Sequence, residues 1–360
     1  MNELKTFAIF CSKDLPFGSS IYATGNSLCL GNWNPVKARE LKYLEKNIWY
    51  LLVLVEFPFD LEFKLFINES LAPKLENIEP FMIKSVHLMP PSKAKEFSDI
   101  YIISFNIRFA NPNDGMNVWK NRSKYVSGLI LNYEPDILGL QEALMEQIDD
   151  LKGELGSVYE IYAVGRGGEA KKNETCAVFY KKERFLALDK GTFWLSETPD
   201  ITQSMLEASR LPRICTWLRL FDFYNEKILY VFNTHLDHMT AKTRLRMTEI
   251  LLGYMEKILM NMMGNVILMG DFNATSNEEC IDLVTKKMSN SCYDDNMFTF
   301  HGWTGQNEGG RIDHIFYKDK KMGLKSFKVI RDSFEEKEIR RFPSDHFPIE
   351  SIFTYKEKKN

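Results

Sequence analysis

The chain lacks long apolar segments, and no run approaches the ~18 to 20 residues that a helix needs to cross a bilayer. It also lacks an excess of charge of either sign, because 46 Lys and Arg face 49 Asp and Glu in 360 residues, for a net charge of −3. We therefore expect neither an integral membrane protein nor a strongly basic surface that neutralises many phosphates of a long nucleic acid. A local basic groove stays compatible with this composition.

Paired cysteine motifs are absent too. The six cysteines are scattered without a C-x-x-C pair, at Cys11, Cys29, Cys176, Cys215, Cys280 and Cys292. This spacing suits reduced thiols better than a disulfide framework. The apolar run 7–11 is shorter than the ~7 to 15-residue core of a secretory signal, and no small-residue cleavage site follows it. We therefore expect a cytoplasmic protein.

The chain has the composition of a folded protein, with 44% hydrophobic and 26% charged residues. At about 150 residues per domain, its length suggests roughly two domains. Residues 1–90 contain short strand-like runs between glycine and proline turns, which predicts a small all-β domain. Residues 91–98 begin with proline and continue with small and charged residues, a pattern typical of a stiff linker.

Strand-like and helical runs alternate from residue 99 to residue 356, which predicts an α/β domain followed by a charged tail at 357–360. We expect helices around residues 119–133, 144–155 and 241–263. Five polar clusters lie at the ends of apolar runs in this domain, at residues 104–107, 140–142, 233–238, 270–273 and 344–348. Ligands of open α/β sheets bind at strand ends, so we expect these clusters to form one site.

The residue types in the clusters suit phosphate chemistry with a hard cation. Asn106 and Glu142 offer oxygen ligands of the kind that Mg²⁺ prefers. Asp271 and Asn273 lie two apart in an extended segment, so their side chains point to the same side. Of adjacent Asp345 and His346, one could reach the cation while the other donates to a phosphoryl oxygen. Taken alone, Gly-Asp-Phe-Asn at 270–273 reads equally well as a turn, and Glu142 as an exposed helix start.

Together these clusters resemble the endonuclease/exonuclease/phosphatase superfamily over about residues 99–356. The resemblance implies a DNase-I-like fold, a four-layer α/β/β/α sandwich that hydrolyses phosphate esters with a divalent metal, Mg²⁺ or Mn²⁺. The metal-binding residues that it implies are Asn106 and Glu142, with Asp345 as a further carboxylate on the metal side.

The same resemblance assigns catalytic roles. Asp271 is expected to orient or deprotonate the attacking water, and Asn273 to hold the phosphate. Asp313 is expected to orient His346, and Glu174 to be the acidic partner of His235. The implied mechanism is direct in-line attack by water, with no covalent intermediate.

The substrate is not specified by these motifs. Arg166, Arg210, Arg213 and the aromatic run 298–303 lie between them. The aromatic rings could stack on a base or sugar, or pack under loops. The near-neutral charge favours a small phosphorylated substrate or a short nucleic-acid end over long duplex.

Residues 24–35 read Thr-Gly-Asn-Ser-Leu-Cys-Leu-Gly-Asn-Trp-Asn-Pro, and Phe-Lys-Leu-Phe follows at 63–66. These motifs resemble the family-20 carbohydrate-binding modules, which bind starch through a small immunoglobulin-like β-sandwich. The resemblance implies that Trp33 stacks on a glucose ring and that Lys64 is a nearby polar contact. Residues 69–81 lack the second tryptophan usual in that family, so a rigid appendage without glucan affinity is the alternative.

The sequence as a whole predicts a metal-dependent phosphoesterase that its first domain directs to glycogen or starch. Two alternatives stay open. One is a nuclease acting on RNA or DNA ends, and the other is a glucan-binding adaptor without catalysis.

Overall fold

The computed structural model describes residues 3–15, 19–45, 47–57, 61–69, 72–78, 80, 82–86, 99–167, 173–259, 265–294, 296–318, 322–336 and 338–356. The chain divides into two compact units, Met1–Pro91 and Ser92–Asn360. The predicted linker at 91–98 and tail at 357–360 lie outside the described residues.

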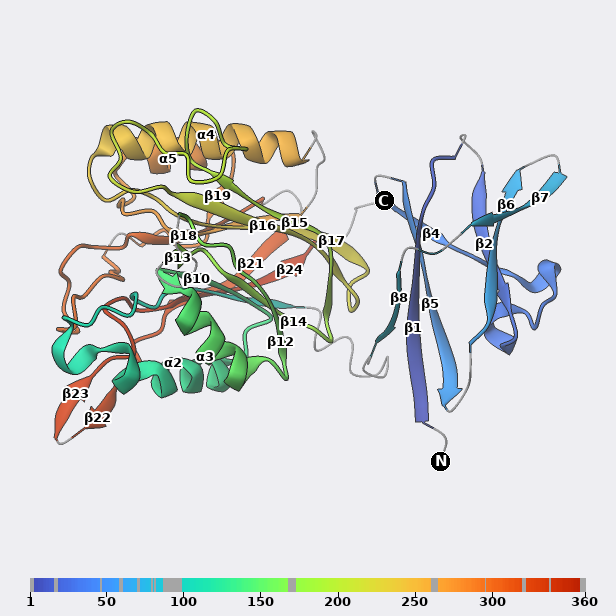
Figure 1. The fold of residues 1–360 in the computed structure, drawn as a ribbon, viewed down its shortest axis with the longest axis horizontal. Helices are drawn as coiled ribbons and strands as arrows, with labels where there is room; N and C mark the ends of the chain where they lie inside the picture. The colour runs from blue at the N-terminus through green and yellow to red at the C-terminus, as the bar shows by residue number, and fades with distance from the viewer. Residues whose placement is uncertain are drawn as a thin grey trace. The chain divides into compact units, whose positions relative to one another are not determined.

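The first unit is an antiparallel β-sandwich of two four-stranded sheets, ordered β4-β5-β1-β8 and β3-β2-β6-β7 (Figure 1). Side chains alternate along each strand, so one face of each sheet supplies the core. Ile9 and Leu51 from one sheet pack with Ala23 and Leu65 from the other. The strands are β1 (Glu3–Ser12), β2 (Ser20–Gly25), β3 (Arg39–Glu40), β4 (Lys42–Glu45), β5 (Ile48–Phe57), β6 (Phe63–Glu69), β7 (Ala72–Ile78) and β8 (Met82–Val86).

The second unit is built on two six-stranded sheets, ordered β12-β14-β10-β9-β24-β21 and β15-β16-β17-β18-β20-β19. The first sheet contains β9 (Ile100–Asn106), β10 (Ile137–Gln141), β12 (Tyr159–Tyr162), β14 (Val178–Lys181), β21 (Met322–Val329) and β24 (Ile349–Tyr355). The second contains β15 (Phe185–Trp194), β16 (Ile214–Asp222), β17 (Lys227–His235), β18 (Asn265–Asp271), β19 (Ser289–Asn290) and β20 (Asp313–Tyr317). Two short pairs complete the strands, β11 (Ala143–Leu144) with β13 (Glu174–Thr175), and β22 (Phe334–Glu336) with β23 (Ile339–Arg341).

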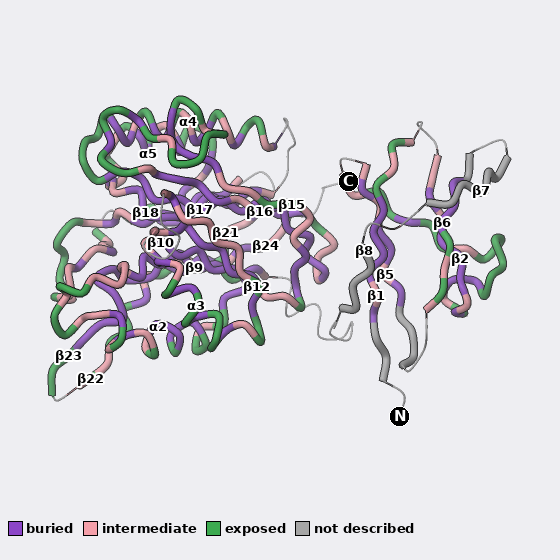
Figure 2. The backbone as a smooth tube through the Cα atoms, viewed as in Figure 1, coloured by how far each residue is buried: buried purple, intermediate pink, exposed green. Residues whose placement is uncertain are grey.

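Helices cover the outer face of each sheet, which confirms the predicted four-layer sandwich (Figure 1). The helices are α2 (Trp119–Tyr133), α3 (Met145–Leu155), α4 (Ala241–Leu259) and α5 (Glu279–Thr285). The core between the sheets contains Ile102 and Ile137 from one and Val231 and Ile267 from the other. Figure 2 shows the buried backbone concentrated in these strands. Among the described helices, none is long and apolar enough to cross a membrane.

Strand directions bring the five polar clusters to one edge of the sandwich. β9 and β10 run parallel, as do β17 and β18, so Asn106 pairs with Gln141 and His235 with Asp271 at their carboxyl ends. β20 runs antiparallel to β18 and begins opposite Asp271, at Asp313. β24 runs antiparallel to β9, which brings the preceding loop 344–348 to the same edge. Strand ends from both sheets therefore meet at the same edge of the sandwich.

Candidate functional site

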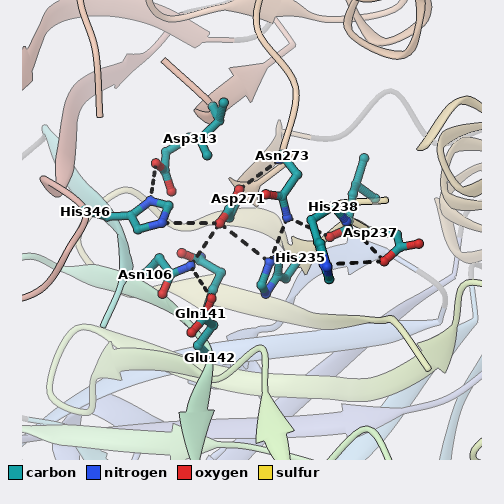
Figure 3. A network of polar contacts seen from close by, with 12 residues as sticks. Asn106, Gln141, Glu142, His235, Asp237, His238, Asp271, Asn273, Asp313 and His346 are labelled. Atoms are coloured by element: carbon teal, nitrogen blue, oxygen red, sulfur yellow. Dashed lines mark hydrogen bonds and ion pairs between the residues drawn. The ribbon is translucent and has the colours of Figure 1, made fainter. Parts of the chain in front are cut away.

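Asp271 lies at the centre of the polar network at this edge (Figure 3). The Asn106 amide donates to Asp271 Oδ2 at 2.9 Å and to Glu142 Oε1 at 3.2 Å. Because Asn106 comes from β9 and Asp271 from β18, this amide joins the two sheets. Glu142 has a φ of +61°, and its Oε2 accepts from the backbone N–H of Phe109 at 3.2 Å.

His346 forms the second part of the network with Asp313. Its Nδ1 lies 2.9 Å from Asp313 Oδ2, and its Nε2 lies 3.9 Å from Asp271 Oδ2. Burial acts to lower the pKa of His346, but the carboxylates of Asp313 and Asp271 outweigh it and raise this pKa to about 10. His346 is therefore an imidazolium at neutral pH, which is a hydrogen-bond donor at both nitrogens.

His235 and Asn273 lie on the other side of Asp271. The Asn273 amide nitrogen lies 3.0 Å from His235 Nε2, and the Asn273 backbone N–H donates to Asp271 Oδ1 at 2.8 Å. Burial, together with the nearby charges of Arg213 and Arg166, lowers the pKa of His235 well below its usual value. If the neutral His235 ring carries its proton on Nδ1, its Nε2 can accept a hydrogen bond from the Asn273 amide.

The Asp271 carboxyl group titrates near neutrality. Burial and the neighbouring Asp313 carboxylate raise its pKa to about 7, against the opposing effect of His346. A general base is most effective when its pKa lies near the working pH. Asp271 therefore has the position and the basicity to accept a proton from water.

The Glu142 and Asp345 carboxylates lie beside this network, and the Asn106 amide presents its nitrogen to Glu142 while its oxygen accepts from the Arg108 backbone N–H at 2.9 Å. Ser344 Oγ donates to Asp345 Oδ1 at 3.2 Å and to the Asn106 carbonyl at 2.7 Å, which ties the loop to β9. Burial and the nearby Glu142 carboxylate raise the pKa of Asp345, against the charges of His346, Arg108 and Arg122. The buried Asp345 carboxylate and the half-buried Glu142 carboxylate repel each other, an arrangement that fits a hard divalent cation.

A second possible metal-binding set is Asp271, Asp313 and His346, whose ligand atoms lie within 4.8 Å of one another. The His346 Nδ1 and Asp313 Oδ2 atoms of this set already face each other at 2.9 Å. A protonated imidazole offers no lone pair to a cation. The Glu142 and Asp345 carboxylates suit Mg²⁺ better, because Mg²⁺ prefers oxygen ligands to the imidazole nitrogen of the second set.

Glu174 pairs with Arg166 in the structure, and its expected role as the acidic partner of His235 stays a prediction. Glu174 Oε1 forms an ion pair with Arg166 at 2.6 Å, and the Arg166 backbone N–H donates to the Glu174 carbonyl at 3.0 Å. The Arg166 backbone is thereby fixed beside β13, and Asn273 takes the place next to the His235 ring. Burial raises the pKa of Glu174 to about 7, although Arg166 opposes this. Glu174 and His235 still line one small cavity.

Three buried polar residues that the sequence analysis left without a role also build the site. Gln141 Nε2 donates to Asn233 Oδ1 at 2.7 Å, and Asn233 Nδ2 donates to the Leu140 carbonyl at 2.9 Å, which links the sheets directly behind Asn106. Arg122 on α2 donates to the carbonyls of Arg108 and Pro343 at 2.7 and 3.1 Å. In the sequence, each of these three residues can be recognised as a polar residue within an otherwise apolar strand or helix face.

The residues expected to bind carbohydrate lie at one end of the first unit. Trp33 is 42% exposed, has a φ of +62°, and donates its backbone N–H to the Gly25 carbonyl at 2.7 Å. Gly25 pairs with Phe63 on β6, next to the exposed Lys64. Trp33 thus lies in a turn bonded to the end of β2, next to the part of β6 that carries Lys64.

Comparisons with known proteins agree with this architecture. Residues 6–79 match the model of the starch binding domain. A mannosyl-6-phosphatase from Bacteroides thetaiotaomicron is similar, with 30% identity, a TM-score of 0.66, and coverage of 71% of this chain and 99% of that one. An endonuclease/exonuclease/phosphatase family protein from Bacteroides vulgatus has 28% identity, a TM-score of 0.65, and coverage of 72% and 99%.

More distant structures share the fold alone. The catalytic domain of human nocturnin has 20% identity and a TM-score of 0.58, with coverage of 72% of this chain and 94% of that one. No curated protein matches the sequence significantly. Residues 103–346, which are more than half of the sequence, match the model of the Endonuclease/Exonuclease/phosphatase family, and the chain therefore belongs to that family.

Proposed function

We propose that the protein is a divalent-metal-dependent phosphoesterase that hydrolyses a phosphate ester by direct attack of water. The observation that carries this proposal is the placement of Asp271, whose Oδ2 accepts from Asn106 and lies between a neutral and a protonated histidine. This arrangement combines a base with hydrogen-bond donors. Those are the groups that in-line hydrolysis of a phosphate ester needs.

Each residue of the network has a place in this reaction. Asn106, Glu142 and Asp345 would hold Mg²⁺ or Mn²⁺, which when bound neutralises charge on the phosphoryl oxygens. Asp271 orients the attacking water and accepts its proton. His346, held by Asp313 at 2.9 Å, donates to a phosphoryl oxygen on which charge develops. Asn273 and His235, which are bonded to each other at 3.0 Å, lie on the other side of Asp271 and would face the phosphate there.

We infer a small phosphorylated substrate, and phosphorylated sugars are the first class to test. The similarity to a mannosyl-6-phosphatase at 30% identity over 71% of the chain supports this choice. We further propose that residues 1–90 direct the enzyme to a glycogen- or starch-type glucan, with Trp33 and Lys64 as its contacts. The six free cysteines support a place for the protein in the reducing cytoplasm.

A substrate panel with and without chelator tests the proposal. Release of inorganic phosphate is measured from phosphorylated sugars, inositols and nucleotides, and shortening is measured for labelled oligonucleotides. We expect phosphate release in Mg²⁺ or Mn²⁺ and its loss in EDTA. Turnover that persists in EDTA contradicts the metal dependence. Shortening of oligonucleotides without phosphate release identifies a nuclease, and inactivity in both assays with glucan binding identifies an adaptor.

Asp271→Asn tests the assignment of the base. The variant keeps the shape of the side chain and removes its basicity, so we expect kcat to fall by about 10²- to 10³-fold. Circular dichroism is expected to match that of the unmodified protein. A folded variant with near-normal kcat on the same substrate would remove Asp271 from the mechanism.

A further inference from the structure

A small cavity adjoins His235 and plays no part in the mechanism above. Its walls include Arg166, Glu174, Arg213 and His235, and all of these except Glu174 are more than nine-tenths buried. Thr175 and Cys176 close it further and are buried as well. The cavity therefore lies beside His235, which we place next to the phosphate.

Arg213 has hydrogen-bonding capacity that its protein surroundings do not use. This side chain is 3% exposed, yet its Nε and NH1 atoms have no hydrogen-bond partner among the described residues. Its NH2 atom alone is engaged, at 3.2 Å from His238 Nδ1 and 3.6 Å from Asp237 Oδ1. Buried polar groups in proteins are nearly always hydrogen-bonded, so such free donors at a site point to an absent acceptor.

The free N–H groups of Arg213, rather than the net charge of the cavity, indicate what this acceptor is. Arg166 is already paired with Glu174 at 2.6 Å, and Asp237 lies beside the Arg213 NH2 atom. These carboxylates match the two guanidinium charges, so net charge alone does not select the ligand. The unused N–H groups select it, because they require an oxygen acceptor and bind an anionic one most strongly.

We propose that Arg213 receives a terminal, non-bridging oxygen of the scissile phosphate and thereby makes the enzyme specific for phosphate monoesters. This inference rests on the proposed phosphoesterase function and names its substrate class. A monoester phosphate presents only unsubstituted oxygens on the side away from its leaving group. A diester places an alkyl group on one of its oxygens, and an alkyl group in this cavity would meet buried side chains and free N–H donors.

A matched pair of substrates tests this assignment. Para-nitrophenyl phosphate and its methyl ester have the same leaving group, and only the methyl ester is a diester. For Arg213→Gln we expect kcat/KM on the monoester to fall roughly 10- to 100-fold, the loss typical of one charged hydrogen bond. We expect little change on the diester and weaker competitive inhibition by inorganic phosphate. Arg213→Lys keeps the charge and should recover part of the monoester activity.

Arg246→Gln is the matched control, because Arg246 lies on the exposed face of α4 and pairs with Glu197. It should leave both substrates unaffected, and thermal denaturation should show each variant to be folded. A folded Arg213→Gln with unchanged monoester activity and phosphate inhibition would overturn the inference. An unmodified enzyme that prefers the diester would also overturn it while leaving the phosphoesterase function in place. Absence of hydrolysis of both esters and of the wider panel would instead overturn the proposed function.

Discussion

His235 and His346 lie 3.5 and 3.9 Å from the same Asp271 oxygen, yet their charges differ. Both are buried, which favours the neutral imidazole. His346 overcomes this through its bond to Asp313, whereas His235 faces Arg213 and Arg166. The residue type alone therefore does not set the role. In the proposed mechanism, the charged neighbours of each ring decide which histidine would donate to the phosphate at neutral pH.

A third histidine gives the protein a testable sensitivity to acid. His314 is fully buried, accepts at Nδ1 from Arg311 at 2.8 Å, and has its Nε2 2.8 Å from the Ala274 carbonyl. Burial and the Arg311 charge lower its pKa to about 3. Below pH 6.5 the unfolded chain takes up a proton at this position that the folded protein does not, so stability falls as the pH falls.

The variant His314→Gln should remove this sensitivity. Between pH 7 and pH 5 we expect its free energy of unfolding to fall by about 2 kcal/mol less than that of the unmodified protein. Urea denaturation at both pH values measures this difference. Although the variant is expected to be less stable at pH 7 through lost packing, only the change with pH tests the idea. Equal changes in the two proteins would show that His314 is not held neutral.

The residue types of the site could be predicted from the sequence, but their partners could not. Asn106, Glu142 and Asp271 stand out because they lie at the carboxyl ends of apolar runs, and Asp345 stands out because it lies just before one. The partner of Glu174 depends instead on a backbone hydrogen bond between this residue and Arg166, which lies in a loop. A contact of this kind is fixed by tertiary packing, and local sequence patterns contain no signal for it.

At the scale of the element, a glycine in β18 allows this strand to approach β17 closely. Gly270 has a φ of +148°, and a Cβ atom there would lie 1.9 Å from the Thr234 carbonyl oxygen on β17. Gly270→Ala must therefore displace one of these two strands at the point where both reach the site. We expect the free energy of unfolding to fall by about 2 to 4 kcal/mol. Catalytic activity should fall as well, because Asp271 is the next residue.

Gly128→Ala provides the comparison. Gly128 lies on the exposed side of α2, and a Cβ atom there would meet nothing within 4 Å. Alanine is the better helix former, so this variant should gain about 0.5 to 1 kcal/mol. Urea denaturation of both variants decides the matter, and equal stability of the two would contradict the role given to Gly270.

Long elements could be predicted from periodicity, whereas the shortest strands could not. The apolar runs locate β9, β10 and β18, but each strand extends to include the polar residue at its carboxyl end, namely Asn106, Gln141 and Asp271. The pairs β11–β13 and β22–β23 contain strands of two or three residues. Such strands form because distant segments meet, and two residues are too few to show a period.

At the scale of the whole molecule, the two units have separate cores, and their activities can be tested separately. Trp33→Ala removes the exposed indole from the first unit, so we expect weaker retention of the full chain on immobilised amylose or glycogen. Stacking of a sugar on one aromatic ring contributes on the order of 1 to 2 kcal/mol, which corresponds to a roughly 5- to 30-fold weaker affinity.

The hydrolysis of a small soluble substrate should not change in Trp33→Ala, because the candidate site lies wholly in the second unit. Trp49→Phe serves as a second comparison, since Trp49 packs against the core of the first unit. It should keep its retention on glucan. Equal retention of Trp33→Ala and the unmodified chain would show that this indole does not bind glucan.

Among the described strands of the second unit, the first, β9, pairs directly with the last, β24, with Ser104 opposite Ile349. The loop that contains Asp345 and His346 precedes β24. During synthesis, a growing chain therefore cannot complete the candidate site before this loop and β24 have left the ribosome. A chain that terminates before Asp345 lacks two of the residues assigned to the site.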